Sequence, residues 1–119
     1  GLVGTPLMPD LCGCILALED IDERPYRVDR ALRQLHLAGC LDGVAGLVFG
    51  RFPCEHPLNY AGPAMHDLLT GWAATLDVPA IAGLPIGHDD DPLSLACGRR
   101  TSLTVSADAW ELRQDERST

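Results

Sequence analysis

Two polar side chains follow apolar segments of the sequence, each just beyond the point where a strand should end. Glu19 comes directly after the apolar residues 14–18, and His88 follows residues 78–82 after a short connection rich in Gly and Pro. In parallel α/β sheets, functional groups gather beyond the carboxyl ends of the strands. A carboxylate that is hydrogen-bonded to an imidazole fixes the ring's tautomer and stabilises the imidazolium formed during acyl transfer. Glu19 and His88 could therefore form a catalytic pair if their strands are neighbours; the alternative is a solvated acidic loop and a surface histidine.

A catalytic pair of this kind also needs a nucleophile, and the sequence offers only weak candidates. Ser94, Ser102 and Ser106 fall among short predicted strands, and none of them lies in a Gly-x-Ser-x-Gly elbow. Among the thiols, Cys97 and Cys54 are the stronger candidates, although such cysteines are more often inert packing residues. The sequence therefore does not identify a nucleophile.

The cysteines do not form a recognisable disulfide or metal pattern. They are five in number, at Cys12, Cys14, Cys40, Cys54 and Cys97. The odd number and irregular spacing disfavour a secreted disulfide framework and favour reduced thiols in the cytoplasm. A zinc site built from Cys12, Cys14, Cys54 and His56 is disfavoured, because one residue between Cys12 and Cys14 is too short a gap for a zinc knuckle. We expect no metal and no cofactor, and a cysteine- or metal-dependent function through Cys54, His56 and Cys97 remains an alternative.

The acidic run Asp89–Asp91 could in principle bind calcium. An EF-hand loop needs alternating ligands, a central Gly and a distal Glu, and none of these follows Asp91. The run therefore predicts a solvated loop.

The elements that would position these residues alternate between strand and helix patterns. Continuous apolar runs at 14–18, 44–49 and 78–82 predict strands buried on both faces. Apolar residues at helical spacing predict helices from Pro25 to a stop at Gly39, and from about Tyr60 to Leu76. Residues 93–96, 102–105 and 110–112 predict short antiparallel strands, and 113–119 a polar, frayed end. The fold class is therefore α/β, with a β-α-β-α-β parallel core followed by short antiparallel strands.

Length, composition and charge exclude several classes of protein and of binding partner. With 119 residues, of which 46% are hydrophobic, the chain has the size and character of one globular domain spanning 1–119. Nine Lys and Arg against 17 Asp and Glu give a net charge of −8, which disfavours nucleic acid as a partner. No apolar run approaches the roughly 20 residues of a membrane span. The chain begins at Gly1 rather than Met, and we expect it to be a piece of a larger cytoplasmic protein.

Three ordered blocks of the sequence resemble the LD-carboxypeptidases, which are serine peptidases that include murein tetrapeptide carboxypeptidase and the microcin-immunity peptidases. Residues 14–35 read CILALEDIDERPYRVDRALRQL, similar to the family's LFLED-x-x-E-x-PYRIDRML-x-QL. Residues 41–52, LDGVAGLVFGRF, resemble its next strand, and residues 79–88, PAIAGLPIGH, resemble P-x-x-x-GLPIGH. Three blocks in the same order make the resemblance specific.

The resemblance implies that this chain is the C-terminal domain of such an enzyme, a swivelling β/β/α-type domain. The family's triad is Ser-Glu-His, and the match assigns its glutamate to Glu19, in preference to Asp20 or Glu23, and its histidine to His88. The serine would lie on a separate N-terminal α/β domain, so the isolated chain should be inactive.

The resemblance also implies the reaction and the partners. The substrate would be a murein tetrapeptide or a similar peptide, cleaved before its terminal D-Ala during peptidoglycan recycling in the bacterial cytoplasm. The chain's own N-terminal domain would be its partner, and a homodimer remains open. Cys12, Cys14 and the acidic run Asp89–Asp91 depart from the family pattern and leave the substrate preference open. A non-catalytic binding or assembly module of the same fold is the alternative function.

Overall fold

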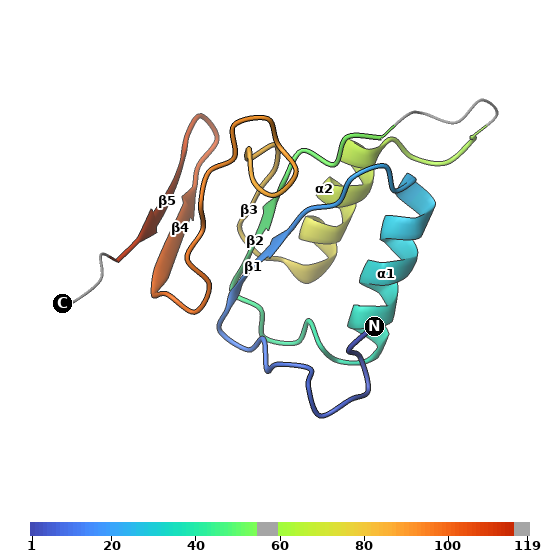
Figure 1. The fold of residues 1–119 in the computed structure, drawn as a ribbon, viewed down its shortest axis with the longest axis horizontal. Helices are drawn as coiled ribbons and strands as arrows, with labels where there is room; N and C mark the ends of the chain where they lie inside the picture. The colour runs from blue at the N-terminus through green and yellow to red at the C-terminus, as the bar shows by residue number, and fades with distance from the viewer. Residues whose placement is uncertain (55–59, 116–119) are drawn as a thin grey trace.

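A three-stranded parallel sheet forms the centre of the molecule, in the strand order β1-β2-β3 (Figure 1). The computed structural model describes residues 1–54 and 60–115. The elements in chain order are β1 (Ile15–Leu18), α1 (Pro25–Leu37), β2 (Gly46–Phe49), α2 (Met65–Leu76), β3 (Ala80–Ile81), β4 (Thr101–Val105) and β5 (Trp110–Gln114). Both neighbouring pairs of the central sheet are parallel, and β4 and β5 form a separate antiparallel pair. The α/β fold predicted from the sequence, with a parallel core and short antiparallel strands after it, is confirmed.

The central strand β2 separates two apolar layers. Leu47 and Phe49 pack with the buried residues of the two helices, whereas Val48 packs on the other face with Ile81. Leu103 of β4 contacts this second cluster, so the hairpin covers the face opposite the helices, as Figure 1 shows. Successive residues of a strand point to opposite faces, so a strand covered on both sides must be apolar throughout. This explains the uninterrupted apolar run of β2.

The helix α1 begins and ends where the sequence predicts. Pro25 occupies the first turn, where its missing N–H has no partner to lose. The helix ends at Leu37, and Gly39 turns the chain away at a φ of 72°. The indole N–H of Trp72 in α2 donates to Asp29 of α1 at 2.9 Å, which fixes the two helices side by side. Neither helix of the described residues is long and apolar enough to cross a membrane.

The second helix and the third strand are shorter than predicted. The helix α2 begins at Met65 rather than near Tyr60: Pro63 disfavours helical geometry at the preceding Gly62, and Ala64 is an extended N-cap with a ψ of 157°. The strand β3 is limited to Ala80–Ile81 because Pro79, which accepts a hydrogen bond from β2, has no N–H to donate.

The antiparallel part contains two strands where the sequence predicts three. Residues 93–96 form no strand, and their backbone bonds elsewhere: Leu93 N donates to Pro85 O at 2.7 Å, Ala96 N donates to the amide oxygen of Gln114 at 3.0 Å, and Nε2 of Gln114 donates to Ala96 O at 3.2 Å. The last strand continues to Gln114, so the predicted frayed end is wrong for 113 and 114, while 116–119 lie outside the described residues.

Candidate functional site

Glu19 and His88 meet although their strands are not neighbours. The condition stated from the sequence was that β1 and β3 pair directly, and this is wrong, because β2 lies between them. The contact instead arises in the segment after β3, which crosses the carboxyl end of β2: Gly83 N donates to Gly50 O at 3.3 Å. Gly50 N in turn donates to Leu18 O at 2.8 Å, beside Glu19. The crossing segment thus brings His88 over β2 to the end of β1.

The two side chains face each other in a defined orientation. Nδ1 of His88 lies 3.1 Å from both Oε1 and Oε2 of Glu19. The backbone N–H of His88 also donates to Oε2, at 3.3 Å. The His88 side chain is 62% exposed and the Glu19 side chain 27%, so the carboxylate is the more enclosed partner. The ring therefore presents its second nitrogen, Nε2, away from Glu19, where an outside group can reach it.

Glu19 is held in its ionised form by this contact. The side-chain hydrogen bond with His88 is the main cause that lowers the pKa of Glu19 below its usual value. Partial burial of Glu19 opposes this effect, whereas the backbone N–H and the charge of His88 reinforce it. An ionised carboxylate at Nδ1 favours the tautomer that carries its proton there, which leaves Nε2 free to accept a proton.

Two glycines make the close approach of Glu19 and His88 sterically possible. A Cβ at Gly87 would overlap the carboxylate carbon of Glu19, and Gly87 has a φ of +71°, in the left-handed region. A Cβ at Gly50 would lie 2.7 Å from Cβ of Glu19 and 3.3 Å from Ile86. Both glycines therefore provide room for the Glu19 side chain, and Gly87 also allows the turn that carries His88.

The pair borders a pocket of about 270 Å³ that Phe52, Ile86 and Arg51 also line. Arg51 forms an ion pair with Asp89 across this pocket, with Nη1 2.9 Å from Oδ2. The side chain of Asp89 is only 9% exposed, so the prediction of a solvated loop is wrong at this position. This ion pair could not be predicted from the sequence, because Arg51 and Asp89 are 38 positions apart and form no local pattern.

The remaining candidates do not join this site. Among the described residues, no serine or cysteine lines the pocket of Glu19 and His88. Ser106 donates to Ala109 O in the β4–β5 turn, and Ser94 and Cys97 are exposed elsewhere. Residues 1–54 and 60–115 contain no group of three His, Cys, Asp or Glu that could hold a metal ion. His56, which belongs to both candidate sets of cysteine and histidine, lies outside the described residues.

The arrangement provides two parts of a nucleophilic site. A carboxylate contacts Nδ1 of an imidazole, and the same histidine borders an accessible pocket. Such a pair can take a proton from a hydroxyl and return it to a leaving amine, provided that another segment brings the hydroxyl to Nε2.

Comparisons with known proteins agree on one family. Residues 1–103 match the family model described as the LD-carboxypeptidase C-terminal domain. The chain is 37% identical over 106 residues to a Synechocystis protein named as a putative carboxypeptidase, covering 88% of this chain and 35% of that protein. It is 30% identical over 105 residues to a Bacillus subtilis protein named as a probable murein peptide carboxypeptidase, covering 87% of this chain and 33% of that protein.

A solved structure has the same fold. The crystal structure of muramoyltetrapeptide carboxypeptidase from Oxalobacter formigenes superposes with a TM-score of 0.85 at 37% sequence identity. The match covers 97% of this chain and 41% of that one. The chain spans about a third of the length of the curated relatives it matches.

Proposed function

The chain belongs to the LD-carboxypeptidase family, with the family's C-terminal domain over residues 1–103, and on this basis we propose that it supplies Glu19 and His88 to a Ser-Glu-His catalytic triad. The observation that carries the proposal is the contact of Nδ1 of His88 with both carboxylate oxygens of Glu19, at 3.1 Å. The nucleophilic serine and its oxyanion hole belong to a separate N-terminal domain. The substrate is a murein tetrapeptide or a similar peptide, cleaved before its terminal D-Ala in the cytoplasm.

The mechanism assigns each group one task. The serine hydroxyl gives its proton to Nε2 of His88 as its oxygen attacks the carbonyl carbon of the scissile amide. Glu19 stays ionised and stabilises the imidazolium through Nδ1–H. His88 then returns the proton to the amine of the departing D-Ala, which breaks the C–N bond and leaves an acyl-enzyme. Water hydrolyses the ester, with His88 again accepting and returning the proton.

The names of two relatives support the substrate class. One is named for a murein peptide and the other for a muramoyltetrapeptide, and both names describe carboxypeptidases. Because no described serine or cysteine lines the pocket, the 119-residue chain alone is expected to be inactive.

The first experiment compares this chain alone with the same chain joined to its N-terminal domain. Release of D-Ala from a murein tetrapeptide is measured for both proteins. We expect release only from the joined protein, and release by the chain alone would contradict the division of the triad between two domains.

The second experiment removes each member of the pair from the joined protein. We expect His88→Ala and Glu19→Gln to lower turnover by about three to four orders of magnitude, as for triad members elsewhere. The matched control for the histidine is His66→Ala, since His66 is an exposed residue of α2. Turnover close to that of the control would exclude both residues from the triad and favour a non-catalytic module.

A further inference from the structure

The loop that carries His88 has few polar contacts with other segments. Across residues 87–92, the hydrogen bonds and ion pairs with other described segments are those of His88 with Glu19 and one ion pair, Asp89 with Arg51. The first contact ties the loop to the end of β1, and the second ties it to the end of β2. The position of the imidazole therefore depends on two attachments, and only one of them is made by Glu19.

Only the Asp89 member of this ion pair is enclosed by the protein. The Asp89 side chain is 9% exposed, whereas that of Arg51 is 59% exposed. An enclosed carboxylate without a partner is unfavourable, and loss of one member of an enclosed ion pair leaves the other charge uncompensated. Without Arg51, the Asp89 carboxylate keeps the hydrogen bond that Asp91 N–H donates to Oδ1 at 3.4 Å, and Oδ2, which faced Arg51, needs water or another donor.

The neighbouring residue offers such a donor. Asp89 follows His88 directly, and both side chains border the same pocket. A free Asp89 carboxylate could accept a hydrogen bond from the other ring nitrogen, Nε2–H, which favours the opposite tautomer from the one that Glu19 favours. Arg51 neutralises this competing carboxylate and holds it at the end of β2.

We propose that Arg51 and Asp89 are a positioning pair that holds the His88 loop over β2 and keeps Glu19 as the partner of Nδ1. The pair acts through His88 and does not touch the reacting atoms. Its consequence for turnover rests on the proposed function, whereas its effect on the imidazole is a property of this chain alone.

The decisive measurement is the tautomer of His88 in the 119-residue chain, from the ¹⁵N chemical shifts of the two ring nitrogens. In the unchanged chain we expect the proton to reside mainly on Nδ1, facing Glu19. Arg51→Met should lower the Nδ1–H fraction about twofold. The freed Asp89 carboxylate then competes with Glu19 for a hydrogen bond with the imidazole. Arg51→Lys keeps the charge and should restore most of this fraction.

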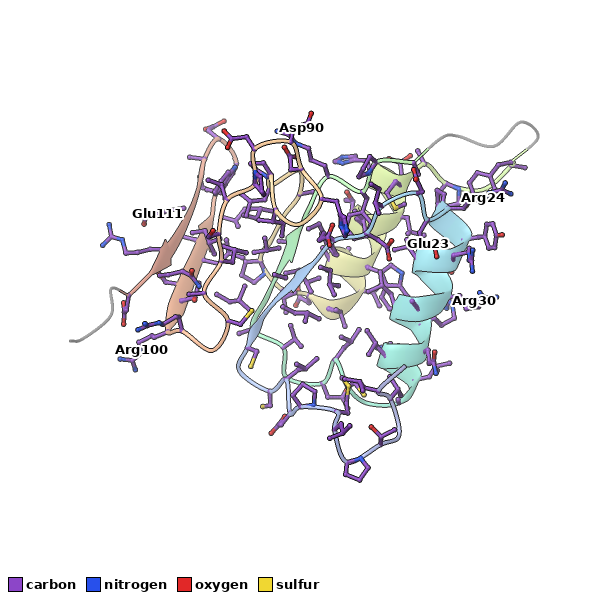
Figure 2. All side chains as sticks on the ribbon, viewed as in Figure 1. Glu23, Arg24, Arg30, Asp90, Arg100 and Glu111 are labelled. Carbon is purple, nitrogen blue, oxygen red and sulfur yellow. The ribbon has the colours of Figure 1, made fainter. Side chains whose placement is uncertain are left out.

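Asp89→Asn is the second variant in the same measurement. The amide oxygen can still accept from Arg51, and the side chain no longer carries a competing charge. We therefore expect a smaller change than for Arg51→Met, and the double variant should resemble Asp89→Asn. The matched control is the exposed ion pair of Arg113 with Glu111 on β5; Figure 2 shows Glu111 on this strand and Asp90 on a different segment. Arg113→Met should leave the ring shifts of His88 unchanged.

Turnover is measured in the chain joined to its N-terminal domain. Arg51→Met should lower kcat about tenfold with KM changed less than about twofold, because a displaced base impairs the chemical step more than binding. If Arg51→Met does not fold, Arg51→Gln takes its place, because glutamine also removes the charge but keeps a polar side chain at this exposed position. Ring shifts for all Arg51 and Asp89 variants equal to those of Arg113→Met would overturn the positioning role. Unchanged activity of His88→Ala would instead refute the proposed function and leave the tautomer result standing.

Discussion

Gly87→Ala should separate the geometry of the candidate pair from the stability of the fold. A Cβ at this position overlaps the carboxylate carbon of Glu19, which is the mobile end of a flexible side chain. The carboxylate can therefore swing away, and the hydrogen bonds to His88 are lost before the backbone must move. The main effect is expected on the pair and not on the core.

The magnitude has two parts. The φ of +71° at Gly87 costs a residue with a Cβ about 1–2 kcal/mol of stability. Displacing the carboxylate by about 1 Å should lower kcat/KM by about 100-fold if the pair is catalytic. Gly98→Ala is the matched control, because Gly98 has a φ of +74° and no atom within 4 Å of a Cβ. This control variant keeps the backbone strain and leaves Glu19 in place.

Two assays distinguish the loss of stability from the loss of activity. Urea denaturation of the 119-residue chain gives the free energy of unfolding, which should fall by similar amounts in both variants. Release of D-Ala by the chain joined to the proposed N-terminal domain should fall strongly for Gly87→Ala and little for Gly98→Ala. Equal activity of the two variants, or an unchanged His88 tautomer in Gly87→Ala, would refute the steric reasoning.

Three further predictions concern the core, the helix contact and acid stability. Leu47→Ala, at a side chain 1% exposed between the layers, should lower the free energy of unfolding by about 2–5 kcal/mol in urea denaturation. Leu37→Ala, at a side chain 80% exposed, should change it by less than about 0.5 kcal/mol. Trp72→Phe removes the indole donor between α1 and α2 and should cost about 1 kcal/mol in the same assay, and no loss would contradict a role for that bond. Because the pKa of Glu19 is lower in the folded chain, its contribution is present above the unfolded pKa and is lost as the pH falls through the folded pKa. Urea denaturation across that acidic range should show a shallower decline for Glu19→Gln, and an identical decline would show that the contact with His88 does not contribute.

The parallel core could be predicted from the sequence because it depends on local patterns of residue type. An apolar run such as residues 46–49 predicts a strand with two covered faces, and Pro25 and Gly39 mark the two ends of α1. The bounds of other elements could not be predicted from such patterns. In the predicted strand 93–96, the backbone of Ala96 bonds instead to the Gln114 side chain, which is 18 residues away in sequence.

The candidate pair could be named from sequence, but its geometry could not. Glu19 and His88 each follow a predicted strand, and the resemblance pointed to the same two residues. Their catalytic role remains a prediction. The route by which they meet, over the end of β2, depends on backbone contacts such as that of Gly83 with Gly50. Strand patterns do not show which strands are neighbours in the sheet. The condition that the strands before Glu19 and His88 pair directly was therefore wrong.

The sequence by itself determined the succession of strands and helices along the chain in the parallel core, the apolar character of that core and the family to which the chain belongs, because these depend on residue types and short-range spacing. Only the tertiary structure decided that Nδ1 of His88 faces Glu19, that Gly87 leaves room for the carboxylate, and that Arg51 holds Asp89. Each of these contacts joins segments far apart in sequence, and only the folded backbone sets the distance between their side chains.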